Sequence, residues 1–78
     1  MKPVDFATIE IFKTNVNDPE SALAIIKRLE STFPFYLFNF DLEDCDRILR
    51  VESKTGQVNT NDLIALVKEE KVNIEILE

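Results

Sequence analysis

Apolar and polar residues alternate along several short stretches of the chain. In residues 6–12, Ala7, Ile9 and Ile11 fall on one side of an extended backbone, and the residues between them fall on the other. Alternation with a period of two is typical of a β-strand that has one buried face. The same pattern predicts strands over residues 6–12, 35–42, 48–52 and 72–77.

Two stretches between these strands carry helix signals instead. Asp18 is a favourable N-cap residue, and Pro19 fits the first helical position. Pro34 ends this helix, because a proline disfavours the helical conformation of the residue before it. Asn59 caps a second helix. The apolar stripes are Ala22, Ile25, Ile26, Leu29 and Phe33 in the first helix and Leu63, Ile64, Leu66 and Val67 in the second.

The order of these elements is strand, helix, strand, strand, helix, strand, which is the order of a ferredoxin-like fold. Right-handed crossovers place both helices on the same face of the sheet. We therefore expect an α+β, ferredoxin-like βαββαβ fold whose four-stranded antiparallel sheet has the first and third strands at its centre. The expected core comprises Ile26, Leu29, Phe38, Phe40, Leu49, Val51 and Ile74.

The sheet face that the helices leave uncovered is the first candidate functional surface. Phe12, Leu37 and Ile48 form the candidate interaction face, which would dock a protein partner or a second copy of the chain in a weak homodimer. The alternative is a partly apolar surface that binds nothing. The residues assigned to the uncovered face are Phe6, Phe12, Leu37, Ile48 and Leu77, interspersed with Thr8, Glu10, Asn39, Arg50, Glu52, Asn73 and Glu75.

Length and charge limit the classes of partner. The 78 residues allow one domain. A net charge of −6 disfavours nucleic acid and anionic membranes as partners. The apolar stretches are too short to cross a bilayer, and the first residues lack the apolar core of a signal peptide. We therefore expect a cytoplasmic protein that binds neither nucleic acid nor membrane.

Residue types that carry catalysis or bind metals are scarce. The chain has no His and one Cys, which removes the commonest general base and any zinc site made of cysteines alone. The acidic segment 41–46 offers oxygen ligands, but its spacing matches no calcium-binding loop. Cys45 lies inside this segment, where neighbouring negative charge disfavours the thiolate. We expect no catalytic residue, no cofactor and no metal, and hence a protein that is not an enzyme.

The segment NFDLEDCDRILRV at residues 39–51, with the chain length and the element order, resembles the heavy-metal-associated domain of copper chaperones and metal-transporting ATPases. The resemblance implies that residues 1–78 form a single domain of this type. The family binds metal through a Met-x-Cys-x-x-Cys motif, whose cysteines align with Asp18 and Ser21. Neither residue supplies the thiolate that Cu(I) requires. The resemblance therefore implies a degenerate member, a non-enzymatic interaction module that has lost metal binding.

A second segment, DPESAL at residues 18–23, is similar to the Asp-x-Pro-Gly-x-Leu turn of ACT domains. Those amino-acid-sensing domains share the same element order. Here the glycine is missing, and the spacing between the aspartate and the proline differs by one residue. This resemblance implies an ACT-like regulatory domain for a small ligand as the alternative function.

Overall fold

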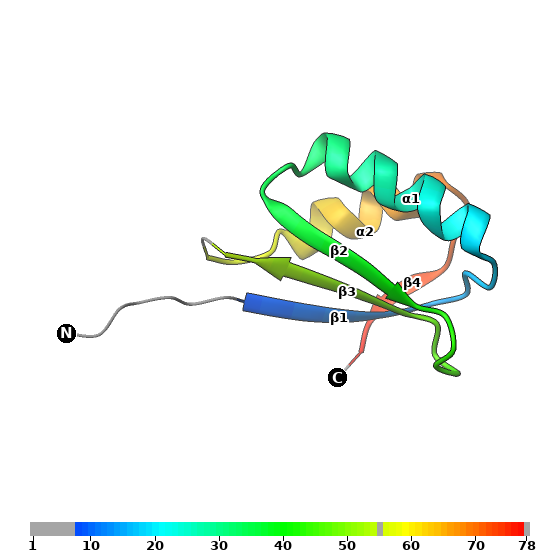
Figure 1. Cartoon of the computed structure of the whole chain (residues 1–78). Helices are drawn as coiled ribbons and strands as arrows, with labels where there is room; N and C mark the ends of the chain where they lie inside the picture. Colours follow the sequence, from blue (N-terminus) through cyan, green and yellow to red (C-terminus); the bar gives the residue numbers. More distant parts are fainter. Residues whose placement is uncertain (1–7, 55, 78) are drawn as a thin grey trace.

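Two helices cover one face of a four-stranded antiparallel sheet and leave the other face open (Figure 1). The computed structural model describes residues 8–54 and 56–77. The elements are β1 (Thr8–Thr14), α1 (Pro19–Thr32), β2 (Tyr36–Asp41), β3 (Ile48–Ser53), α2 (Thr60–Glu69) and β4 (Ile74–Ile76). The strands lie in the order β2-β3-β1-β4, so β1 and β3 are central. The predicted ferredoxin-like arrangement is confirmed.

The helices begin and end where local sequence signals place them. At the start of α1, the side chain of Asp18 accepts a hydrogen bond from the backbone N–H of Ser21, and the backbone of Asp18 is extended. Asn59 caps α2 in the same way, with its side-chain oxygen accepting from the backbone N–H of Asp62. After α2 the chain turns at Lys71, whose φ is 63°. Both predicted caps are confirmed.

The prediction that Phe12 lies on the open face is wrong, because Phe12 is fully buried beneath the helices. It lies opposite Leu49 of β3, which is buried as well. Ile9 and Ile11, on the other side of β1, turn to the open face, and Ile9 is 42% exposed. Both sides of this strand are apolar, so alternation alone does not choose between them, and the larger aromatic ring is the one that is buried.

Thr8 and Glu10 share the side of β1 that carries Phe12, so their assignment to the open face is also wrong. Phe6, which was assigned to the same face, lies outside the described residues. Every β1 side chain therefore lies on the side of the sheet opposite to the one predicted. This is the usual result when the predicted phase of a strand is wrong by one residue.

The core lies between the sheet and the helices. Of the residues expected there, Leu29, Leu49, Val51 and Ile74 are buried, whereas Phe38 and Phe40 are only partly buried, like Ile26. The two phenylalanines face the core, but they lie on β2 at the edge of the sheet, where no further strand covers them. The buried apolar side chains are Phe12, Val16, Ala22, Ile25, Leu29, Leu49, Val51, Val58, Leu63, Val67 and Ile74.

The end of β1 is tied to the β2–β3 hairpin through Thr14. The buried Thr14 hydroxyl donates to the backbone carbonyl of Arg47 at 2.6 Å, and the Thr14 N–H donates to the carbonyl of Asp46 at 3.1 Å. Two hairpin residues therefore oppose one residue of β1, and Arg47 adopts a φ of 46° to make this possible. The contact extends β1 two residues beyond the strand predicted from alternation.

Replacing Phe12 with Ala should lower the free energy of unfolding by about 3–5 kcal/mol, because it empties a fully buried site. A domain of this length has a total stability of roughly 4–12 kcal/mol, so the variant should be largely or partly unfolded near body temperature. Phe40→Ala should cost less, because Phe40 is half-buried. The matched control is Ile9→Ala on the opposite side of β1, which should cost about 1 kcal/mol or less. Urea unfolding of the variants measures these losses, and an equal loss for Ile9→Ala and Phe12→Ala would contradict the register.

Candidate functional site: the open face of the sheet

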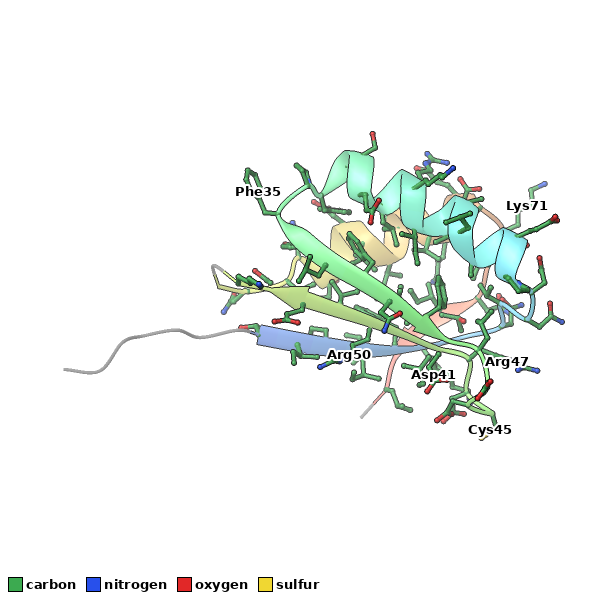
Figure 2. All side chains as sticks on the ribbon, in the orientation of Figure 1. Phe35, Asp41, Cys45, Arg47, Arg50 and Lys71 are labelled. Carbon is green, nitrogen blue, oxygen red and sulfur yellow. The ribbon has the colours of Figure 1, made fainter. Side chains whose placement is uncertain are left out.

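The open face is the side of the sheet away from the helices. Alternation along each strand, combined with the strand register, places its members in rows across the sheet. Figure 2 shows Arg50 and Asp41 on this side. The open face comprises Ile9, Ile11 and Lys13 of β1, Leu37, Asn39 and Asp41 of β2, Ile48, Arg50 and Glu52 of β3, and Glu75 of β4 followed by Leu77.

Apolar side chains on the open face are contiguous across the centre of the sheet. Ile9 and Ile11 are neighbours along β1, and Leu77 lies beside Ile11, whose carbonyl accepts the Leu77 N–H at 2.9 Å. Ile48 lies diagonally from Ile11 on the adjacent strand. Leu37 stands apart at the β2 edge and is 52% exposed. Two of the three predicted interaction residues, Leu37 and Ile48, therefore lie on the open face, and Phe12 does not.

Charged residues of both signs surround this apolar centre. Arg50 lies between Ile11 and Asn39 in the register, and it makes no ion pair within the part of the chain that the structure describes. Lys13 lies opposite Glu75, and its ammonium is 3.9 Å from the Asp46 carboxylate. The face carries two basic and three acidic residues, so its charge is close to balance in a chain of net charge −6. Such a mixed surface is compatible with a second surface of the same kind.

Asp18 and Ser21, which the predicted resemblance to heavy-metal-associated domains aligns with the metal-binding cysteines of that family, lie together at the start of α1. The Asp18 carboxylate accepts the Ser21 backbone N–H at 3.0 Å, and this bond lowers the pKa of Asp18. The charged carboxylate is thus favoured at the helix N-terminus, where it also complements the helix dipole. These two residues form a helix cap, and their side-chain atoms are hard oxygen donors.

The acidic hairpin places Asp44, Cys45 and Asp46 within 4.8 Å of one another by their ligand atoms. Turn geometry accounts for this proximity, because the Asp44 carboxylate accepts the Asp46 backbone N–H at 2.8 Å. In the same turn, Asp41 accepts the backbone N–H of Glu43 at 3.3 Å. Cys45 is exposed. The arrangement is that of a largely exposed turn.

An open hollow of roughly 430 Å³ lies at the end of the sheet where β1 finishes and β4 begins. Asn15 and Asn73 border it, and the Asn15 side chain accepts the Asn73 backbone N–H at 3.0 Å. Two ammonium groups and one carboxylate contribute to its walls, so it presents both charges to solvent. Its lining residues are Lys13, Thr14, Asn15, Lys68, Asn73, Ile74 and Glu75.

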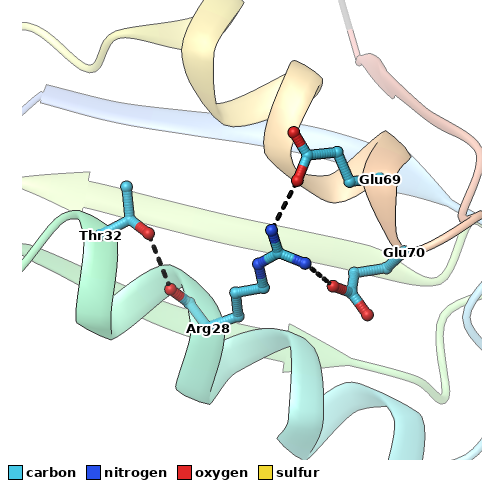
Figure 3. Close-up of polar contacts among 4 residues, drawn as sticks. All are labelled: Arg28, Thr32, Glu69 and Glu70. Carbon is cyan, nitrogen blue, oxygen red and sulfur yellow. Dashed lines mark hydrogen bonds and ion pairs between the residues drawn. The ribbon is translucent and has the colours of Figure 1, made fainter.

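The two helices are joined on their outer surface by two ion pairs that sequence reasoning missed. The guanidinium of Arg28 in α1 contacts the carboxylates of Glu69 and Glu70 at the end of α2 (Figure 3). Glu70, as its main hydrogen-bond partner, raises the pKa of Arg28. No local pattern signals a pair separated by 41 and 42 residues. These ion pairs connect α1 to the end of α2 on the side of the molecule away from the open face.

Comparison with protein-family models, with curated proteins and with solved structures gives no match to this chain. The resemblances to the heavy-metal-associated and ACT domains therefore stay predictions. Among the residues that the structure describes, no helix combines the length and the apolar composition that crossing a membrane requires.

We predict that the protein does not bind Cu(I) tightly, because Asp18 and Ser21 provide no thiolate. Competition with a chromophoric chelator measures the affinity, and Cys45→Ser controls for the lone exposed thiol. Binding of one ion per chain, tighter than about 1 µM and retained in Cys45→Ser, would contradict the prediction. The double substitution Asp18→Cys and Ser21→Cys should create Cu(I) binding if the scaffold is of the heavy-metal-associated type, and its failure to do so would count against that resemblance.

Proposed function

We propose that this protein is a non-enzymatic interaction module whose open face contacts the open face of a second copy. The observation that carries the proposal is the contiguous apolar centre of Ile9, Ile11, Ile48 and Leu77 on an uncovered sheet surface. Burying such a patch against another protein removes apolar area from water, which is the main driving force of association. The acidic hairpin offers no comparable apolar surface among the described residues.

The non-enzymatic part of the proposal rests on the available side chains. The chain contains no His, and its one Cys lies in an exposed turn. The acidic groups of the hairpin are solvated, and Arg28 is already engaged by Glu69 and Glu70. General acid–base chemistry needs a pocket that shifts the pKa of such groups, and the hairpin tip is not a pocket.

A second copy suits the open face because its charges are self-complementary. In a two-fold contact, a residue away from the axis meets a different residue of the other copy, and the relation is reciprocal. Arg50 and Lys13 of one copy can therefore face Glu52, Asp41 or Glu75 of the other. The open face also avoids the excess negative charge of the acidic hairpin, which would repel a second copy.

The size of the open face sets the strength of the contact. The five residues Ile9–Lys13 extend about 16 Å, and four strands span about 19 Å, which gives a plan area of roughly 300 Å² per copy. A stable protein interface buries about 800 Å² per partner. The contact is therefore weak and reversible, with charged residues forming a polar rim.

NMR spectra recorded from about 20 µM to about 1 mM test the proposal, because this range covers weak association. The methyl signals of Ile9, Ile11, Ile48 and Leu77 should shift with concentration. Ile9→Glu and Ile48→Glu should abolish these shifts without unfolding the chain. Leu23→Glu is the matched control, since Leu23 is an equally apolar residue on the outside of α1 that is 54% exposed. Methyl signals that do not respond to concentration, or a Leu23→Glu variant that behaves like Ile9→Glu, would refute the face-to-face contact.

The hollow beside Asn15 and Asn73 favours a second candidate function, regulation by a small ligand. Its ammonium groups suit a carboxylate, and Glu75 suits an amine, so a zwitterion such as a free amino acid matches its charges. This is the ligand class that the ACT resemblance implies. A rise in melting temperature with one member of an amino-acid panel, lost in Lys68→Gln and kept in Lys27→Gln, would support it. A flat response across the panel would exclude it.

A further inference from the structure

Strand β2 is an edge strand without the features that usually protect an edge. Proteins guard exposed edges with charged residues, proline, bulges or very short strands. From Tyr36 to Phe40 the strand reads YLFNF, and its only charged residue, Asp41, stands at its end. The opposite edge is formed by β4, which has three residues with Glu75 at its centre. Of the two edges, only β2 is therefore long and free of charged residues over most of its length.

The hydrogen-bond pattern shows which backbone groups of β2 point outward. The Leu77 N–H donates to the Ile11 carbonyl, so Ile11 bonds toward β4 and the next residue, Phe12, bonds toward β3. Following the register across β3, the backbone groups of Leu37 and Asn39 bond to β3. The N–H and carbonyl groups of Phe38 and Phe40 therefore point away from the sheet. The Tyr36 N–H also points away from β3, since it donates to the Phe33 carbonyl, which is consistent with this alternation along β2.

The side chains along this edge are apolar and incompletely covered. Tyr36, Phe38 and Phe40 face the helices but are only partly buried. The Tyr36 ring stacks on Phe33 at 5.3 Å between centroids and meets Phe38 edge-on at 6.2 Å, which makes a continuous aromatic row. Phe35, just before the strand, is 77% exposed and is labelled beside the start of β2 in Figure 2. A strand added beyond β2 would cover this row.

We propose that β2 pairs antiparallel with β2 of a second copy and joins the two sheets into one of eight strands. Pairing about Asn39 places Phe38 opposite Phe40 of the second copy. Each copy then donates the N–H groups of Phe38 and Phe40 to carbonyls of the other, and the outward carbonyls of the same residues accept in return. Residues opposite each other lie on the same side of the sheet, so both helical layers stay on one side and the two open faces become continuous.

A second copy fits this edge better than an unrelated strand, because the pairing is self-complementary under a two-fold axis. Asp41 lies opposite Leu37 of the second copy, so the only charged residues on the two strands are kept apart. The aromatic rows also meet on the helix side, which adds cross-strand aromatic contacts. The proposal uses the edge of the sheet and is independent of the face-to-face contact proposed above.

Backbone amide exchange of the full chain tests the pairing directly. At low concentration the Phe38 and Phe40 amides should exchange rapidly with solvent, since they point outward. At high concentration their protection should rise at least tenfold, while the outward amide of Ile76 on the β4 edge stays unprotected. Ile9→Glu should leave this protection intact, which separates the edge from the open face.

Chemical synthesis provides a variant that changes one hydrogen-bond donor and no side chain. In the Ile9→Glu background, which removes the face-to-face contact, N-methylation of Phe38 should abolish the concentration-dependent protection of Phe40 and reduce association by at least tenfold in sedimentation. N-methylation of Ile76 removes the equivalent donor from the β4 edge and should change neither. Circular dichroism establishes that both chains fold. Phe38 and Phe40 amides that stay unprotected at high concentration, or equal effects of the two methylations, would overturn the proposal.

Discussion

The burial of Phe12 against Leu49 is the contact on which the other surfaces of the sheet depend. β1 pairs with both β3 and β4, so the side of the sheet on which its residues lie also determines the side on which their partners in these strands lie. With Phe12 inward, Ile9 and Ile11 must face outward and complete the apolar centre of the open face. The same phase directs the backbone groups of β2 and so decides which amides remain at its edge.

Local chemistry explains why so much of the fold could be predicted. Asp18, Pro19 and Asn59 define helix starts through contacts within a few residues, and these contacts form in the structure as the sequence indicates. The order of elements then leaves few topologies. The side of β1 that is buried could not be read in this way, because Phe12 and Ile9 are both apolar and the choice depends on the strands that pair with them.

The same distinction applies to the candidate surfaces. Leu37 could be placed on the open face because the opposite side of β2 is clearly apolar and was expected to be buried. Ile48 could be placed there because β3 pairs with β2 in a simple hairpin. The incomplete burial of Phe38 and Phe40 follows from the position of β2 at the edge of the sheet, which is a property of topology. The ion pair between Arg28 and Glu70 joins two helices that are distant in sequence, and no sequence pattern near either residue predicts it.

The order of the strands also has a consequence for how the chain folds. The β2–β3 hairpin closes over a short turn, whereas β1 must meet β3 and β4 across long stretches of chain that include a helix, as in the pairs Thr8 with Ser53 and Thr14 with Ile74. Contacts that are close in sequence form faster than distant ones. We therefore expect the hairpin to form before the completed sheet, with both of its edges open during that interval. Refolding at high concentration will compete with intermolecular pairing of nascent hairpins, and the yield of native chain will fall accordingly.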